Sequence, residues 1–484
     1  MSRETPIRVS PADSSSPSTD TPPPFPNRSP RARQTLAALA ALSLAIAGCR
    51  GVPTAGERQA RNQHQALAAR YKPGDRTATL PTLDAKSSLE TLVTYAMLNQ
   101  PRVEAAYYDY AAALERITVE RSLPDPRLTL QLDVQDLVGA VMPGLMMDLP
   151  WMKKLRLRAD TATAETEAKY YLFETAVLQA AFDVKRPYYQ LYFLNERLRV
   201  NQETLGLLGQ FEQLARTQVE SGKATLQDVL RAQIEQERLK TEIVNLEDSR
   251  TPLIAQLKAA LGLRPDQPSP PIPAAFSSTS LDLTSDQLLA VGLARNPRLR
   301  SMEAEVRMAE SGIRLARTSR LPDFTVGAEA DVKASPIMAR PSVGVTLPIW
   351  RDKIAAELAS AQNTKSAAQA RLSSEQIQLA VEFADKSFMY REATRNLRLL
   401  ADSLLPKARQ ALDVARSGYS SARIDFINLL DAERSLLEFQ LAEVEARTRR
   451  ELALAEISLV ILGTPPDSAP VLPPASTVES SKKP

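Results

Sequence analysis

Hydrophobic and polar positions follow a helical period along most of the chain, with two short interruptions. After Asn99 and again after Asn296, apolar residues recur every three or four positions for about 20 residues. Each run stops at a Leu-Pro-Asp sequence, because proline ends a helix at the residue before it. The pattern predicts one amphipathic helix in each place.

Strict alternation replaces the helical period after both Leu-Pro-Asp sequences and predicts a β-hairpin in each. The apolar positions of the outgoing strands are Leu128, Leu130, Leu132 and Val134, and Phe324, Val326, Ala328, Ala330 and Val332. A loop with Pro143 or Pro336 leads to a return strand that contains Leu145, Met147 and Leu149, or Val343, Val345 and Leu347. We expect each strand to have one apolar and one polar face.

Helical periodicity returns after each hairpin and continues for roughly 65 residues, which corresponds to about 100 Å of helix. Heptad spacing runs through Val177, Val184, Leu191, Leu198 and Leu205, and through Phe383, Tyr390, Leu397 and Leu404. This spacing predicts coiled-coil packing. Turns near 221–222 and 420–422 should reverse the chain into a second long helix, and Pro187 and Pro406 should bend the helices.

The chain is an internal duplication. Five short sequences recur in the same order at separations of 196 to 201 residues. They are centred on Pro101 and Pro297, Pro124 and Pro322, Pro150 and Pro348, Leu230 and Leu430, and Leu261 and Leu462. We predict a first repeat at 85–264, a Pro/Ser-rich linker at 265–282, a second repeat at 283–464 and a disordered Pro-rich tail at 465–484.

The predicted fold class is mainly α with a small β part, and the strands point to a membrane. Four strands of about eight to ten residues cannot close a barrel, and lipid does not tolerate an open sheet edge. If the strands span a membrane, several chains must share them, and strand length and facing fit that role. Trp151 and Trp350 follow the return strands, where an interfacial aromatic belt would lie. The alternative is a small soluble sheet that caps a coiled coil.

Composition removes several classes of function. A net charge of +3 over 484 residues shows no excess for binding nucleic acid. One Cys and one His are too few for Cys/His zinc ligation, a catalytic triad or a disulfide framework. The chain has neither a phosphate loop nor a dinucleotide-binding sequence. We therefore predict that the protein is not an enzyme and has no cofactor.

A group of four methionines is the one candidate for soft-metal ligation, since thioethers bind Cu(I). The residues are Met142, Met146, Met147 and Met152. Met142 is expected in the outward loop and Met147 at an apolar strand position, and no His or Cys joins them. We predict no metal site, and we expect His64 to be a surface residue.

The N-terminus has the pattern of an exported protein. Residues 1–48 read as a signal peptide with a long n-region, because the apolar run at 35–47 is too short for a spanning helix of roughly 20 residues. The run closes with Ile-Ala-Gly before Cys49, which resembles a bacterial lipobox. The resemblance implies lipid on Cys49, a lipid-anchored segment at 49–84, and, with Arg50 following the Cys, the outer membrane. The alternative is an ordinary signal peptide with an incidental Cys.

Over residues 85–465 the arrangement resembles the TolC family of outer-membrane efflux factors, in particular its lipid-anchored branch in tripartite RND-type pumps. The shared features are the duplicated order of helix, hairpin, long helix, turn and helix, and two local sequences. Residues 149–156 are similar to the Pro-Trp-x-x-Lys segment of heavy-metal efflux members. Residues 425–434 are similar to the family's Leu-Asp-Ala-x-Arg segment.

The resemblance implies a homotrimer in the outer membrane that extends into the periplasm, with a 12-strand β-barrel and a 12-helix α-barrel. It implies a passive export duct that works with a periplasmic adaptor and an inner-membrane pump. Adaptor docking would fall on the helical tips, at Gly222, Ser221, Ala422 and Ser421. Ala422 stands where the family usually has Gly, so we expect a less tight turn at the second tip.

The resemblance also assigns a periplasmic gate to Ile427, Asn428, Asp431 and Arg434. An acidic residue repeated threefold around a narrow pore concentrates negative potential, and an Arg one turn away can bind a carboxylate of a neighbouring chain. The alternative for Asp431 and Arg434 is a solvated ion pair within one helix. For the whole protein, the rival function is a structural coiled-coil lipoprotein of the envelope without a lumen.

Overall fold

The computed structural model describes residues 53–71, 73, 80–84, 87–134, 138–271, 285–332, 334, 336–465 and 471–472. The chain separates into two units, residues 1–51 and 52–484, and only the second contains described residues. The predicted signal peptide and Cys49 therefore lie outside the described residues.

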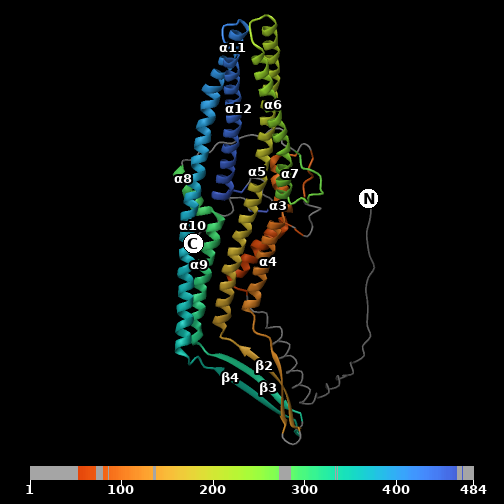
Figure 1. Cartoon of the computed structure of the whole chain (residues 1–484). Coiled ribbons are helices and arrows are strands. Elements are labelled where there is room, and N and C mark those ends of the chain that lie inside the picture. The colour runs from red at the N-terminus through yellow and green to blue at the C-terminus, as the bar shows by residue number, and fades with distance from the viewer. Residues whose placement is uncertain are drawn as a thin grey trace, which may run out of the picture. The chain divides into compact units, whose positions relative to one another are not determined.

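The first half of the unit contains a short N-terminal helix, a β-hairpin and a very long helix (Figure 1). Its elements are α2 (Ala55–Arg70), α3 (Leu89–Asn99), α4 (Pro101–Arg121), β1 (Arg127–Val134), β2 (Val138–Leu149), α5 (Met152–Glu220), α6 (Leu226–Asp248) and α7 (Arg250–Ala260). The α5 helix has 69 residues and continues through Pro187. The returning helix is divided at Ser249, because Pro252 has no N–H to donate to the carbonyl of Asp248, where α6 ends.

The second half repeats this order. Its elements are α8 (Ser285–Arg295), α9 (Pro297–Ala316), the 3₁₀ turn η2 (Arg317–Arg320), β3 (Asp323–Asp331), β4 (Met338–Thr346), α10 (Arg351–Leu399), the π turn η3 (Leu400–Leu404), α11 (Leu405–Ser420), α12 (Phe426–Ala455) and the π turn η4 (Glu456–Ile461). The expected irregularity at Pro406 takes the form of η3, because the missing proline N–H leaves the preceding turn to widen.

The four strands form one antiparallel sheet in the order β1-β2-β3-β4. The two hairpins have the same register once 198 is added to each residue number: Arg127 faces Met146, and Thr325 faces Gly344. One expectation was wrong. Met142 and Pro143 lie inside β2, which begins at Val138, and not in the loop. Pro143 is tolerated there because its φ is compatible with an extended chain and because it lies outside the β2–β3 ladder, which runs from Gly144 to Leu149.

The repeated short sequences meet at the middle of the long helices. The Asn99 side chain donates to the carbonyl oxygen of Leu261 (2.9 Å), and the Asn296 side chain donates to that of Ile461 (2.9 Å). Gly262 has a φ of +71°, and a Cβ there would lie 2.8 Å from the Asn99 carbonyl oxygen. Each Asn thus ties the junction of two helices, α3 with α4 or α8 with α9, to the end of the last helix of the same repeat.

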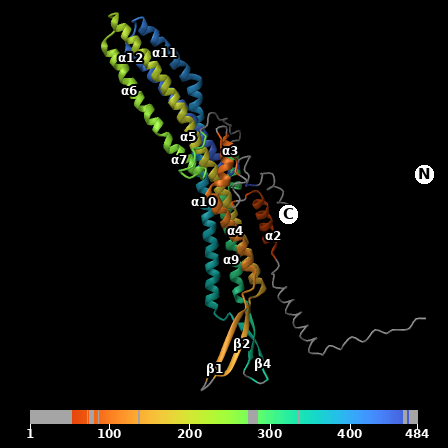
Figure 2. The same cartoon turned by 90° about the vertical axis from the view of Figure 1, so that its right-hand side faces the viewer.

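Long helices lie side by side, with the sheet beyond one end of them and both helical turns at the other (Figure 2). The α5 helix packs against α4, α9, α6 and α12, so it joins the two repeats. Its buried side chains form one core with α3, α4 and α7 near the middle and a second core with α6, α11 and α12 toward the turns. Apolar residues on several faces of α5 are buried, as its many neighbours require.

Candidate functional site at the helical tips

Both helical hairpins turn in the same way. In the first, the N–H of Lys223 donates to the carbonyl of Gln218 (2.9 Å); in the second, the N–H of Arg423 donates to that of Gly418 (2.8 Å). These bonds close Schellman-type ends around a residue in the left-handed region, Gly222 at φ +72° and the alanine at the matching position at +57°.

The expectation of a less tight second turn was therefore wrong. Ala422 adopts the conformation that glycine would adopt, and its N–H donates to the Tyr419 carbonyl (3.0 Å), as that of Gly222 donates to Val219 (3.0 Å). The hydrogen bonds and the packing below the turn impose this conformation at a cost of about 1 kcal/mol to a residue with a Cβ.

The two tips are in direct contact. The side chain of Gln218, at the end of α5, donates to the backbone carbonyl of Ser420 (3.0 Å) at the end of α11. Below this bond, the rings of Tyr419 and Phe426 lie 5.1 Å apart inside the core that both hairpins share. Ser221, Ser421 and the two φ-positive residues are exposed at the surface beyond it.

The predicted gate pair is present and has a third member. An Nη1 atom of Arg434 lies 3.5 Å from Oδ1 of Asp431, one turn earlier on α12. The other arm of Arg434 binds Glu235, which is on α6 in the first hairpin. Arg434 therefore joins the two hairpins of one protomer. Sequence analysis missed Glu235, because only packing of α6 beside α12 brings it there.

The remaining gate candidates lie on the first two turns of α12. Ile427 is half-buried and Asn428 is exposed; the N–H of Asn428 donates to the carbonyl of Asp425 (3.1 Å), which precedes the helix. Asp431 is 61% exposed. The acid of the predicted gate thus faces the surface of the isolated protomer.

A buried acid next to the gate pair was not predicted. Glu433 is 3% exposed and lies on the inward face of α12. Burial, and then the negative charge of Glu235, raises its pKa from 4.5 to about 7, although Arg434 opposes this shift. In the sequence, its spacing from Phe426, Leu429 and Leu430 marks the apolar stripe of the helix and was the available sign of burial.

In the first hairpin, the surroundings lower the pKa of an acid instead of raising it. Glu212 on α5 accepts hydrogen bonds from Arg216 (2.6 Å), Gln233 (2.8 Å) and Gln236 (2.8 Å). These bonds, that of Arg216 first, lower its pKa to about 2. The carboxylate pins α5 to α6 in its charged form.

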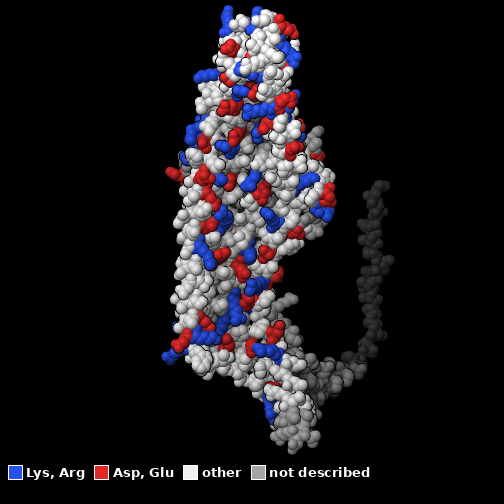
Figure 3. Space-filling view, in the orientation of Figure 1, with Lys and Arg blue, Asp and Glu red and all other residues white. Residues whose placement is uncertain are grey.

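The sheet exposes a row of apolar side chains. Leu128, Leu130, Leu132, Leu145, Val326, Val343 and Val345 are each at least 43% exposed. Cross-strand pairs such as Leu128 with Leu145 set them on one face, whereas Arg127, Thr129 and Thr325 occupy the alternate positions. Charges of both signs are instead mixed over the helical surface (Figure 3). An exposed apolar face of this extent requires a partner or lipid.

The two predicted belt residues stand where this sheet joins the helices. Trp151 and Trp350 are the residues before α5 and α10, and they are 43% and 71% exposed. The Trp151 ring lies 6.1 Å from that of Phe324. None of the described helices combines the length and apolar character that a membrane-crossing helix needs.

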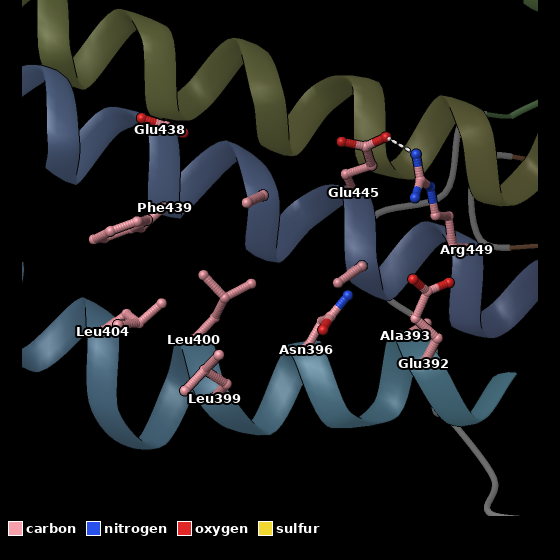
Figure 4. Close-up of a pocket in the computed structure, with 12 residues that line it drawn as sticks. Glu392, Ala393, Asn396, Leu399, Leu400, Leu404, Glu438, Phe439, Glu445 and Arg449 are labelled. Carbon is pink, nitrogen blue, oxygen red and sulfur yellow. Dashed lines mark hydrogen bonds and ion pairs between the residues drawn. The ribbon is translucent and has the colours of Figure 1, made fainter. Parts of the chain in front are cut away.

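A cavity of about 290 Å³ lies between α10, η3 and α12 (Figure 4). One end is lined by Leu399, Leu400 and Phe439, and at the other end Arg449 donates to Glu445 on the same helix (2.6 Å). Its lining residues include no Ser, Cys or His, so no nucleophile and base converge there.

Two smaller expectations concern metal and histidine. Among the described residues, no three His, Cys, Asp or Glu side chains are grouped as metal ligands. His64 is not a simple surface residue: it is half-buried, its ring stacks on that of Tyr107 at 5.7 Å, and its Nε2 lies 3.3 Å from the Tyr107 hydroxyl. Burial lowers its pKa.

Comparison with known proteins identifies the family. The family described as outer membrane efflux protein matches residues 92–263 and 288–462, one segment in each repeat. This chain belongs to the outer membrane efflux protein family. It is accordingly a channel protein for efflux, and the predicted TolC-like arrangement of a mainly helical chain with few strands is confirmed.

Relatives of this efflux protein are distant in sequence. It is 23% identical over 370 residues to the cobalt-zinc-cadmium resistance protein CzcC of Cupriavidus metallidurans, covering 72% of this chain and 84% of CzcC. It is 26% identical over 326 residues to the pyoverdine export outer membrane protein OpmQ of Pseudomonas putida, covering 63% of this chain and 66% of OpmQ.

Solved structures share its fold. The outer membrane protein VceC of Vibrio cholerae aligns with a TM-score of 0.65 at 19% identity, covering 78% of this chain and 96% of VceC. The open state of the MtrE outer membrane channel of Neisseria gonorrhoeae aligns with a TM-score of 0.66 at 17% identity, covering 79% and 94%.

Proposed function

We propose that three copies of this chain form the outer-membrane channel of a tripartite efflux system. The observation that supports this most directly is the sheet: β1 and β4 are open edges, and one face exposes an apolar row. Four strands cannot close around a pore, whereas three sheets supply twelve strands and remove all edges. The twelve strands would span the outer membrane, and the helices would continue the duct into the periplasm.

The N-terminal helix supports a lipid anchor on Cys49. Glu57, in the first turn of α2, is fully buried and its Oε2 lies 2.8 Å from Nε of Arg121, in the last turn of α4. That end of α4 leads directly to β1. Five residues lie between Cys49 and Ala55, an extended reach of at most about 20 Å, so a lipid on Cys49 would be available to the membrane beside the strands.

The gate would be the ring of three Asp431 side chains, with Arg434, Ile427 and Asn428 beside it. In each protomer Arg434 holds α12 to α6 through Glu235, so release of this contact would free the second hairpin to move outward. The tips around Gly222, Ser221, Ala422 and Ser421 are exposed and would receive a periplasmic adaptor, which links the channel to an RND-type inner-membrane pump.

The channel would transport passively and leave selection to the pump. The names of these two relatives refer to cobalt, zinc and cadmium resistance and to pyoverdine export, which are different roles. A water-filled duct that opens at its periplasmic end would serve both roles. Energy would come from the inner-membrane partner.

Single-channel recording in planar bilayers tests the duct and its gate together. We expect the purified trimer to conduct ions, and we expect conductance to rise in the double variant Asp431→Ala, Arg434→Ala, because both the acidic ring and the tie to α6 are lost. The matched control is Glu237→Ala, Lys240→Ala, which removes an exposed ion pair of α6 (2.7 Å) that lies outside the proposed gate.

Two outcomes would contradict the proposal at different levels. Unchanged conductance of the gate variant in an assembled trimer would remove the gate assignment only. If the wild-type protein and every variant assemble but none of them conducts ions, the result would favour the rival, a coiled-coil spacer of the envelope without a lumen.

A further inference from the structure

The two repeats of one protomer are joined at the base of the sheet by a clamp of four hydrogen bonds. Nζ of Lys154, in the first turn of α5, lies 2.8 Å from both carboxylate oxygens of Asp323 and donates to the carbonyl of Leu321 (3.0 Å). The N–H of Trp151 donates to the same carboxylate (3.1 Å). The Lys154 side chain is only 12% exposed, whereas that of Asp323 is 37% exposed, so the ammonium is the largely desolvated member of this charge pair.

Every residue type of this clamp occurs a second time in the chain, but in the protomer the second copies do not contact one another. Lys353 is the third residue of α10, as Lys154 is of α5, and Trp350 precedes α10 as Trp151 precedes α5. The helices repeat at a shift of 199 residues, one more than the strands, so the second repeat has one extra residue in this connection. The Leu-Pro-Asp sequence that ends in Asp323 recurs at 123–125.

In the protomer these second copies face solvent. The Lys353 side chain is 72% exposed, and its recorded carboxylate contact is with Glu357, 3.9 Å away on its own helix. Asp125 is exposed. They lie at opposite edges of the sheet, because Asp125 precedes β1 and Lys353 follows β4. A clamp between them is therefore possible only between two chains.

The strand pairing defines how the two edges would meet. The two repeats meet in the sheet where β2 pairs with β3, and we call this pairing the internal seam. In it, Met147 of β2 faces Val326 of β3. The hairpins repeat with a shift of 198 residues, so the same seam between chains sets Val345 of β4 opposite Leu128 of the next β1. This ladder starts at Arg127, because Pro126 stands where β3 has Phe324 and has no N–H.

We propose that neighbouring protomers are joined by a copy of this internal seam: Lys353 binds Asp125 of the partner subunit, Trp350 donates its N–H to that carboxylate, and Val345 pairs with Leu128 of the partner subunit. This inference rests on the proposed trimer and specifies its interface. The partner is a second copy of the chain, since the charges, the open strand edges and the register all match its opposite edge.

Disulfide trapping tests the register. The chain has a single cysteine, Cys49, so engineered pairs meet little competition. Residues that face one another in an antiparallel ladder have Cα atoms about 4.5–5.5 Å apart, which a disulfide can bridge, whereas diagonal neighbours about 7–8 Å apart cannot be bridged without backbone movement. We expect Val345→Cys, Leu128→Cys to give covalent trimers on non-reducing denaturing gels and the shifted pair Val345→Cys, Leu130→Cys to give mostly monomers.

Two controls make each result decisive. The pair Met147→Cys, Val326→Cys samples the internal seam and should link only within one chain, and each single-Cys variant should stay monomeric on the gel. Light scattering in mild detergent reports the assembly of every variant separately. A trimer in which only the shifted pair crosslinks would overturn the register, whereas absence of any trimer would contradict the proposed function itself.

Charge reversal tests the clamp. Lys353→Asp should lower the thermal stability of the trimer, and adding Asp125→Lys should restore most of that loss, because the reversed pair re-forms across the interface. Lys154→Asp is the matched change inside the protomer, and Asp125→Lys should not rescue it. A loss on Lys353→Asp that Asp125→Lys fails to restore in assembled trimers would exclude this ion pair.

Discussion

The two helical hairpins have the same turn and opposite electrostatics. When their tips are aligned, Gln233 of the first corresponds to Glu433 of the second, and Glu212 corresponds to Leu412. The first hairpin holds a carboxylate with three donors, and the second buries one against another acid.

This difference predicts that the second hairpin is easier to release than the first. The charged form of Glu212 strengthens the packing of α5 on α6, whereas the charged form of Glu433 weakens the packing of α12. The Arg434–Glu235 contact then holds the weaker hairpin to the stronger one. Backbone likeness alone conceals this division of roles.

The largest expected effect on the stability of the protein is that of Glu433→Gln. The pKa of Glu433 is about 7 in the folded chain and 4.5 in its ordinary state. The folded protein is therefore fully stable with respect to this group below pH 4.5, where the acid is protonated, and it loses stability as the pH rises through 7 and the buried acid becomes charged. Gln imitates the protonated acid and should stabilise the protein by about 3 kcal/mol above that range. Thermal unfolding by circular dichroism across this pH range measures it; equal pH slopes for variant and wild type would contradict it.

A smaller effect, a loss of stability, is expected when the first hairpin is given the acid of the second. Gln233→Glu removes one donor from Glu212 and sets a second carboxylate beside it, at a cost of about 1–3 kcal/mol at neutral pH. The control Gln233→Met removes the donor without adding charge. Amide hydrogen exchange of α6 should be faster in the Glu variant than in the Met variant at pH 7. The difference between the two exchange rates should disappear at acidic pH, because the added carboxylate is then protonated.

The smallest effect concerns the one backbone difference between the tips. Ala422→Gly should stabilise the second hairpin by about 1 kcal/mol, and Gly222→Ala should weaken the first by a similar amount, because only the latter adds a Cβ at positive φ. Chemical unfolding of both variants and of the double variant gives the comparison. If Ala422→Gly proves destabilising, the turn found here is not the preferred one.

The local sequence predicted the elements with a strong hydrophobic period, but it did not predict contacts between residues that are distant in the sequence. The helices after Asn99 and Asn296, the hairpins and both tips were predicted, because proline, alternation and heptads are local physical constraints. Pro143 was predicted in a loop, but it lies in β2 and pairs with Leu130. Asp431 and Arg434 were predicted from a local resemblance, whereas their partner Glu235 is nearly two hundred residues away.

By itself, the sequence determined that this protein is duplicated, mainly helical and built with two apolar-faced hairpins, since each of these properties is a periodicity along the chain. Tertiary structure decided which acid holds its proton more strongly. Glu212 and Glu433 are the same residue type with the same reference pKa, and only the neighbours brought by packing, donors in one hairpin and burial beside Glu235 in the other, move their pKa values in opposite directions.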